Sequence, residues 1–222
     1  MNTRESTVSL IAASAVRANL PAMTVNTQSE RRRIDPGGAA GNELLTSATA
    51  AVLTALLVAL GVTILDMSGL VTEHMLIGLA LVPPLVLKLS STGYRLVRYY
   101  TGSRPYTAKG PPRLPLRVLA PLLVAATLVV FASGIALLAV GHKAGWLLEI
   151  HKVSFIVWGA VFGVHFLAYA TRAARSLAGA WRATGPEAVA GGRLRGVLVA
   201  GAVGGGVALA VALLPAIHAW RP

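Results

Sequence analysis

Long apolar stretches dominate the pattern of hydrophobic and polar positions along the chain. They cover residues 44–65, 74–89, 116–140, 146–170 and 196–217, and the second continues as a more amphipathic helix towards Tyr100. An α-helix needs about 20 apolar residues to cross the hydrocarbon core of a bilayer. The first stretch has no polar face of the kind that a buried helix of a soluble domain would show. The pattern therefore predicts an all-α fold, a polytopic membrane helix bundle with five transmembrane helices.

Polar segments divide these stretches and set the predicted domain organisation. Residues 1–42 are polar and small, which is typical of a disordered tail, and residues 43–222 form the transmembrane helix bundle. Arg17 interrupts the short apolar run at 8–16, and no good cleavage pattern follows, so a secretion signal is not expected. A short turn with two acids is predicted at 66–73. Pro83-Pro84 is expected to kink the second helix, because proline cannot donate a backbone hydrogen bond.

Composition supports the membrane interpretation and removes several kinds of site. The chain is 55% hydrophobic with a mean hydropathy of +0.67, and only 13% of its residues are charged. Soluble domains carry about 25% charged residues. Cysteine is absent. Disulfides, zinc–thiolate sites, iron–sulfur clusters and covalently attached haem are therefore excluded.

The net charge of +12 could indicate nucleic-acid binding, but the distribution of the basic residues along the chain indicates a membrane topology instead. The chain has 20 lysines and arginines. All of them except Lys143, Lys152 and Arg221 lie in the tail or in the segments 88–117 and 172–195. Five spans put these three segments on one side, and short basic loops stay in the cytoplasm. We therefore expect an inside N-terminus, an outside C-terminus and lipid contacts in the cell membrane, with no nucleic-acid partner.

Three histidines are the candidate functional residues. An imidazole inside a membrane costs free energy, so its presence there needs a reason. His151 and His165 are 14 residues apart in the fourth stretch, about 40° short of four helical turns, and so share nearly one face. His74 opens the second stretch at the same outer depth as His151. Imidazole is a common axial ligand of haem iron. The alternative is that a histidine simply lies at the membrane surface among hydrated lipid headgroups. We prefer this alternative for His142 in the outer turn and for His218 at the outer end of the fifth stretch.

Small and basic residues near these histidines are compatible with a porphyrin without requiring one. Gly78 follows His74 by four residues and Gly159 follows His151 by eight, which puts each glycine near the face of its histidine. Glycines in membrane helices also serve packing alone. Lys143 and Lys152 could pair with haem propionates or extend to the headgroups. Gly201 and Gly205 form a Gly-x-x-x-Gly pattern that could meet the first span or another chain.

This arrangement of His74, His151 and His165 resembles the four-helix membrane cytochrome b families, which include quinone-linked haem subunits of bacterial oxidoreductases and ferric-reductase-like proteins. In these families two helices each carry a pair of histidines 14 residues apart, and the pairs ligate two stacked haems. The resemblance covers roughly residues 44–175 and implies a four-helix haem-type core plus one helix. It also implies haem b at His74 and His151, a quinone and an extracytoplasmic redox partner, and the role of haem subunit in an oxidoreductase complex.

The chain departs from the family pattern at Lys88, where the second histidine of the partner helix is expected. One outer haem is therefore favoured and two are the maximum, with His165 the less certain ligand. No flavin or nicotinamide motif is present, so the chain does not itself draw electrons from NAD(P)H. Two other functions stay open. One is a non-redox membrane scaffold or accessory protein with degenerate haem sites. The other is a transporter, which the lack of mid-span carboxylates disfavours.

Overall fold

The structure, a computed structural model, describes residues 38–222 apart from 109, 111–113, 142–143, 183–188 and 221–222. Across that part the chain is almost entirely helical and has no strand, which confirms the all-α prediction. Four segments of the described chain are long and apolar enough to cross a membrane. They are Gly38–Tyr100, Arg117–Val140, Gly145–Ala180 and Gly192–Ala212. These segments make the chain a multi-pass membrane protein.

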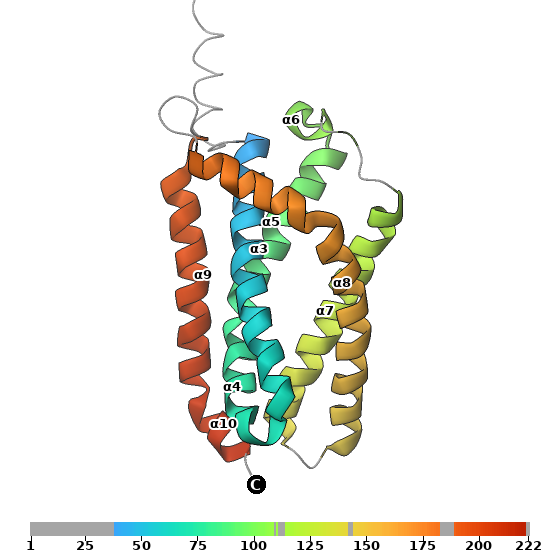
Figure 1. The fold of residues 1–222 in the computed structure, drawn as a ribbon, viewed down its shortest axis with the longest axis vertical. Coiled ribbons are helices and arrows are strands. Elements are labelled where there is room, and N and C mark those ends of the chain that lie inside the picture. Colours follow the sequence, from blue (N-terminus) through green and yellow to red (C-terminus); the bar gives the residue numbers. More distant parts are fainter. Residues whose placement is uncertain (1–37, 109, 111–113, 142–143, 183–188, 221–222) are drawn as a thin grey trace, which may run out of the picture. The chain divides into compact units, whose positions relative to one another are not determined.

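The first of these segments reverses direction within itself. Helix α3 (Gly38–Thr63) ends in the short 3-10 helix η1 (Ile64–Asp66), and α4 (Met67–Ala80) then returns beside α3 (Figure 1). The predicted turn at 66–73 was therefore wrong in its extent, since helix resumes at Met67. Helix α3 also includes residues 38–42, which the sequence assigned to the tail. The rest of that predicted tail lies outside the described residues.

A capping contact explains why the reversal is so short. The Asp66 carboxylate accepts hydrogen bonds from the Gly69 backbone N–H at 3.1 Å and from the Ser68 hydroxyl at 2.9 Å. An aspartate at this position satisfies a backbone donor that the first turn of α4 would otherwise leave open. The same two donors, the Gly69 N–H first, hold the pKa of the Asp66 carboxyl below its ordinary value.

The predicted break at the prolines is confirmed. Helix α4 stops at Ala80 and α5 (Val82–Tyr100) starts again after Leu81, with prolines in its first turn. Pro84 lacks the N–H that would bond the Ala80 carbonyl. Helix α9 (Gly192–Ala212) comes closest at this point: a methyl group on Gly206 would collide with the Ala80 carbonyl oxygen. The glycine face of α9 thus meets α4 and α5. The sequence had allowed either the first span or another chain as the partner of this face.

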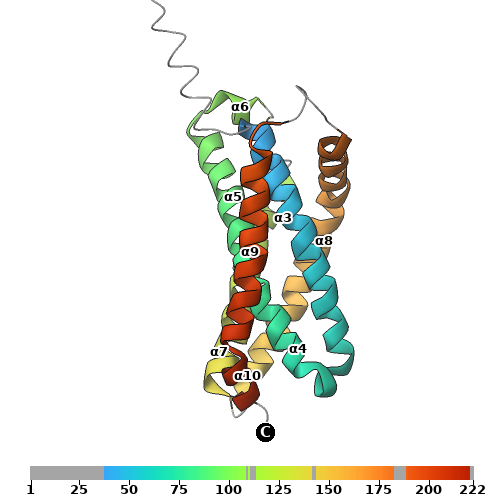
Figure 2. The same cartoon turned by 90° about the vertical axis from the view of Figure 1, so that its left-hand side faces the viewer.

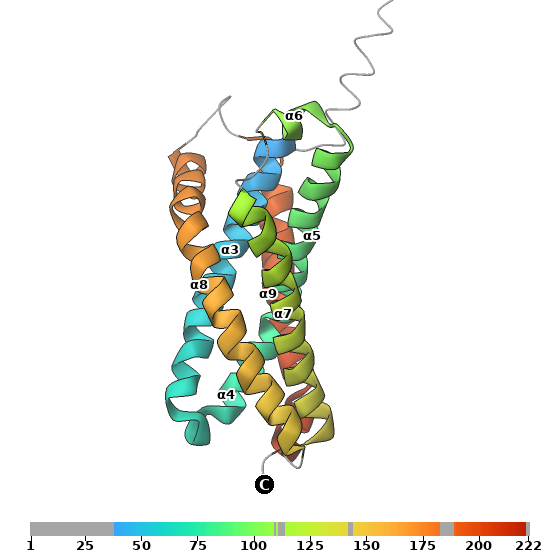
Figure 3. The same ribbon diagram turned by 90° about the vertical axis from the view of Figure 1, so that its right-hand side faces the viewer.

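The remaining long helices form a hairpin. Helix α7 (Leu114–Val140) packs along α8 (Gly145–Arg182), and the two lie side by side in Figure 3. Helix α8 is longer than predicted, because it continues through part of the second basic segment and bends across the end of the bundle (Figure 1). The chain closes with α10 (Leu214–Trp220), and the short α6 (Arg104–Thr107) follows α5.

The helices fall into two packed groups. Helices α3, α4, α5 and α9 contact one another, as Figure 2 shows for α9 against α5, whereas α7 contacts mainly α8. Contacts of α8 with α3 and of α10 with α7 join the groups. Only small clusters are buried, one around Leu79 and Ile217 and one around Leu137. Leu65 and Leu167 are 86% and 78% exposed, as expected where lipid covers an apolar surface.

Candidate functional site

His74 lies on α4, directly after the reversal of the chain. Its Nδ1 is 2.8 Å from the hydroxyl oxygen of Thr63, a buried residue at the end of α3. The Thr63 hydroxyl gives its single proton to the Leu60 carbonyl. It is therefore left to accept from His74, which puts the imidazole proton on Nδ1. The tight turn at η1 brings these two residues together although they are 11 positions apart.

His151 lies on α8 and is held by the facing helix α7. Its Nδ1 is 3.1 Å from the Val130 carbonyl oxygen and 3.0 Å from the Ser133 hydroxyl oxygen. A carbonyl oxygen only accepts, so Nδ1 carries the proton here as well. The Ser133 hydroxyl donates to the same Val130 carbonyl at 3.0 Å. The two histidines thus share one feature, a ring fixed through Nδ1–H by a neighbouring helix.

Gly134 makes room for the His151 ring. A methyl group at that position would lie 3.1 Å from Cε1 of His151, tighter than ordinary van der Waals contact. At Gly78 and Gly159, which the sequence singled out, an added methyl group would meet open space. Sequence reasoning missed Thr63, Val130, Ser133 and Gly134. The pair Ser133-Gly134 within an otherwise apolar stretch was the only signal for them.

The free ring nitrogens define what the site can do. No hydrogen bond from the described residues reaches Nε2 of His74 or of His151. A protonated Nδ1 and a bare Nε2 form the tautomer that binds a metal through Nε2, with the Nδ1 hydrogen bond fixing the ring. This donor set fits a haem iron held from two sides.

The two helices that carry the histidines are not packed directly on each other. Helices α4 and α8 carry the two histidines, yet no extensive contact joins them in the described part of the chain. They are linked through α3, which packs against both. A pair of helices in direct contact has axes 8–10 Å apart and leaves no room for a cofactor between them. Direct packing of α4 on α8 therefore does not close the space between the two histidine-bearing helices.

The surroundings of His165 are built differently. His165 is half-buried on α8, and its ring centre lies 4.7 Å from that of Tyr169. The sequence placed Lys88 opposite His165 in depth, and this placement stays a prediction. The Lys88 amine donates a 2.8 Å hydrogen bond to the Thr46 carbonyl on α3. Neighbouring bonds from Asn42 and Thr46 to Ser91 tie the same two helices together.

The remaining histidines take no part in this arrangement. His218 on α10 is exposed, and its predicted place at the membrane surface stays a prediction. His142 and Lys143 lie outside the described residues, and the exposed Lys152 pairs with Glu149 at 2.9 Å. Among the described residues no cluster of three His, Asp or Glu side chains could hold a metal ion. A metal held by His74 or His151 would therefore have to bring ligands of its own, as a haem iron does.

Comparison with protein-family models, with curated proteins and with solved structures finds no match to this chain.

Proposed function

We propose that the chain is a membrane-embedded b-type cytochrome subunit that transfers electrons through one haem b between His74 and His151. One observation carries the proposal: both imidazoles are fixed through Nδ1–H by groups on another helix and keep Nε2 free. Ligation by two imidazoles gives a haem that exchanges single electrons without binding substrate at the iron. The resemblance to the four-helix membrane cytochrome b families supports the same assignment.

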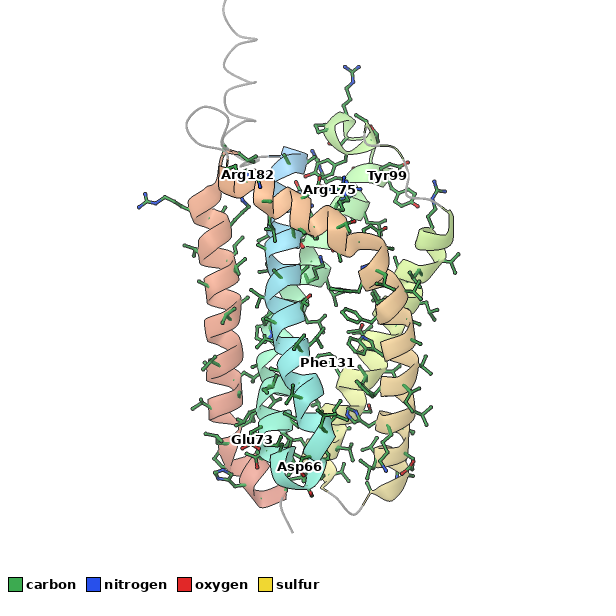
Figure 4. The ribbon with its side chains drawn as sticks, viewed as in Figure 1. Asp66, Glu73, Tyr99, Phe131, Arg175 and Arg182 are labelled. Carbon is green, nitrogen blue, oxygen red and sulfur yellow. The ribbon has the colours of Figure 1, made fainter. Side chains whose placement is uncertain are left out.

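The proposal includes an orientation. The reversal at Ile64–Asp66 supports counting Gly38–Tyr100 as two crossings, which makes five spans in all. Asp66 and Glu73 lie at one end of the bundle and Arg175 and Arg182 at the other (Figure 4). Basic ends face the cytoplasm. The N-terminus is then inside the cell membrane, and the haem lies near the outer surface, within reach of a quinone and an extracytoplasmic redox partner.

The proposal includes one haem, with His165 as a less certain second ligand position. Lys88 bonds the Thr46 carbonyl and so contributes to the packing of α3 against α5. A lysine used in this way supports loss of the inner haem. It also favours the alternative function, a non-redox membrane scaffold or accessory protein in which both haem sites have degenerated.

A haem spectrum distinguishes these two functions. The chain, expressed with added haem and purified, is recorded oxidised and after dithionite reduction. We expect a Soret band, a reduced α-band and about one haem per chain. His74→Ala and His151→Ala should each abolish the reduced α-band, because a low-spin haem needs both imidazoles.

His218→Ala is the matched control, because this exposed histidine should leave the spectrum unchanged. Circular dichroism and gel filtration check that every variant is folded. A folded wild-type chain without a Soret band would leave the scaffold as the function. Loss of the spectrum in His165→Ala, with His151→Ala unaffected, would move the haem to the inner end.

A further inference from the structure

A cavity of about 670 Å³ opens at the basic end of the bundle, between the first turns of α3 and the last turns of α8. Its polar lining comes from Glu43, Arg172, Arg175 and Ser176. Arg175 lies at the same end as Arg182, opposite the acidic turn (Figure 4). We call this cavity the arginine groove. It is remote in sequence from His74 and His151, and neither histidine lines it.

The two arginines of the groove are held in place. Arg172 donates from Nε to a Glu43 carboxylate oxygen at 3.2 Å, and Glu43 is only 19% exposed. Arg175 donates from Nε to the Thr171 carbonyl oxygen at 3.2 Å. Each guanidinium has further N–H groups beyond Nε, and such forks match phosphate oxygens. Among the described lining residues two arginines stand against one carboxylate, which gives that lining a surplus positive charge.

The rest of the lining is apolar and small. Ala40 and Leu44 contribute from α3, Gly179 and Ala180 from α8, and Val189 from the segment before α9. A free inorganic ion gains nothing from contact with apolar side chains, whereas the glycerol and acyl portion of a lipid can pack against them. The groove also lies where α3 begins and where α8 runs across the end of the bundle (Figure 1). When the apolar helices span a bilayer, that end of the bundle lies at the level of the headgroups. Phosphate-binding and apolar surfaces therefore meet at a depth where a lipid has both parts.

We infer that the arginine groove binds an anionic phospholipid, with its phosphate on Arg172 and Arg175 and its acyl chain along Leu44 and the small residues of α8. Glu43 orients Arg172 and weakens the attraction for the anion. The inference does not depend on haem. Assignment of the lipid to the inner leaflet rests on the proposed orientation, and the binding itself does not. Basic residues at the membrane surface attract anionic headgroups in this way.

Native mass spectrometry of the full chain tests the groove. The protein is released from nanodiscs containing equal amounts of phosphatidylglycerol and phosphatidylcholine, and the retained lipid is identified. We expect selective retention of phosphatidylglycerol. Arg175→Gln should weaken it about fivefold, since each basic residue near a membrane surface contributes on that order. Glu43→Gln should strengthen it, because the opposing charge is removed while the arginines remain.

The matched control is the double variant Arg104→Gln and Arg193→Gln, which removes two exposed arginines outside the groove. It should retain phosphatidylglycerol like the wild type. An equal loss in this control would show unspecific attraction to the basic end and overturn the inference. Equal retention of both lipids would do the same. Displacement of the lipid by millimolar inorganic phosphate would assign the groove to a free anion. Haem spectra of these variants keep the outcome separate from the proposed function.

Discussion

At the scale of single residues, the orientation of the two imidazoles depends on groups with no haem chemistry of their own. His151 has two oxygen acceptors on α7, the Val130 carbonyl and the Ser133 hydroxyl. His74 has one, the Thr63 hydroxyl. Because a ring held by one acceptor loses its orientation when that acceptor is removed, the two histidines should differ in their sensitivity to mutation.

Thr63→Val and Ser133→Ala test this difference. Thr63→Val keeps the shape of the side chain but removes the only acceptor of His74 Nδ1–H, so haem affinity should fall about tenfold or more. Ser133→Ala should cost less, because His151 still donates to the Val130 carbonyl. Haem titration of the apo-protein measures both affinities. A larger loss in Ser133→Ala would contradict the assigned hydrogen bonds.

Lys88 provides a second test at this scale, because it occupies the place of an expected histidine. Lys88→Met should keep about one haem per chain, since the proposed outer ligands are unchanged. Its thermal stability should fall through loss of the bond to the Thr46 carbonyl. Lys88→His restores a histidine 14 residues after His74, and we expect haem content to rise towards about two per chain. A folded Lys88→His protein with unchanged haem content would contradict an inner site at His165.

At the scale of the elements, the break between α4 and α5 and the glycines of α9 form one packing unit. Pro84 leaves the Ala80 carbonyl without its helical donor, and Gly206 approaches that oxygen closely enough to exclude a side chain. A Cα–H group of glycine at such a distance is a weak donor to a carbonyl. The close approach also brings α9 against Pro83 through Gly205. The position of α9 therefore depends on a residue without Cβ at 206.

Gly206→Ala should destabilise the protein, because the added methyl group meets backbone, which cannot move aside as a flexible side chain would. Overpacking of this kind costs about 1–3 kcal/mol. The matched control is Gly204→Ala on the same helix, where the added methyl group meets open space. Thermal unfolding in detergent should show a lower midpoint for Gly206→Ala alone. Equal midpoints for the two variants would contradict the packing of α9 on α4.

At the scale of the whole molecule, the two groups of helices are joined at few places. The α7–α8 hairpin contacts the other helices mainly through α3 and α10, and Trp220 on α10 donates to the Leu137 carbonyl at 2.9 Å. The proposed haem would add a further link, because His74 belongs to one group and His151 to the other. Haem binding should therefore raise the thermal stability of the whole bundle.

The proposed orientation is directly testable because the chain has no cysteine of its own. Ser68→Cys, in the first turn of α4, should react with an impermeant maleimide added to intact cells. Thr101→Cys, between α5 and α6, should react only after the membrane is opened. Both positions are exposed, so accessibility depends on the side of the membrane. The reverse labelling would contradict an inside N-terminus, and labelling of both from outside would contradict two crossings within Gly38–Tyr100.

The sequence predicted most of the elements because membrane helices follow from apolar length, and apolar length is a local property. It placed the proline break correctly for the same reason, since proline lacks its donor wherever it stands. It also paired His74 with His151 and Lys88 with His165 by depth, and these pairings stay predictions. It misjudged the turn at 66–73 and the length of α8, where capping and bending, not hydropathy, set the limits.

By itself the sequence determined the all-helical class and the apolar segments, both of which follow from spacing along one chain. Tertiary structure alone decided the partners of the rings. Thr63, Val130, Ser133 and Gly134 lie on other helices, and their distances from His74 and His151 depend on how those helices pack. The same holds for the bond from Lys88 to Thr46 and for Gly206 against Ala80. Such contacts require closeness in space between residues far apart in sequence, which a hydropathy pattern does not record.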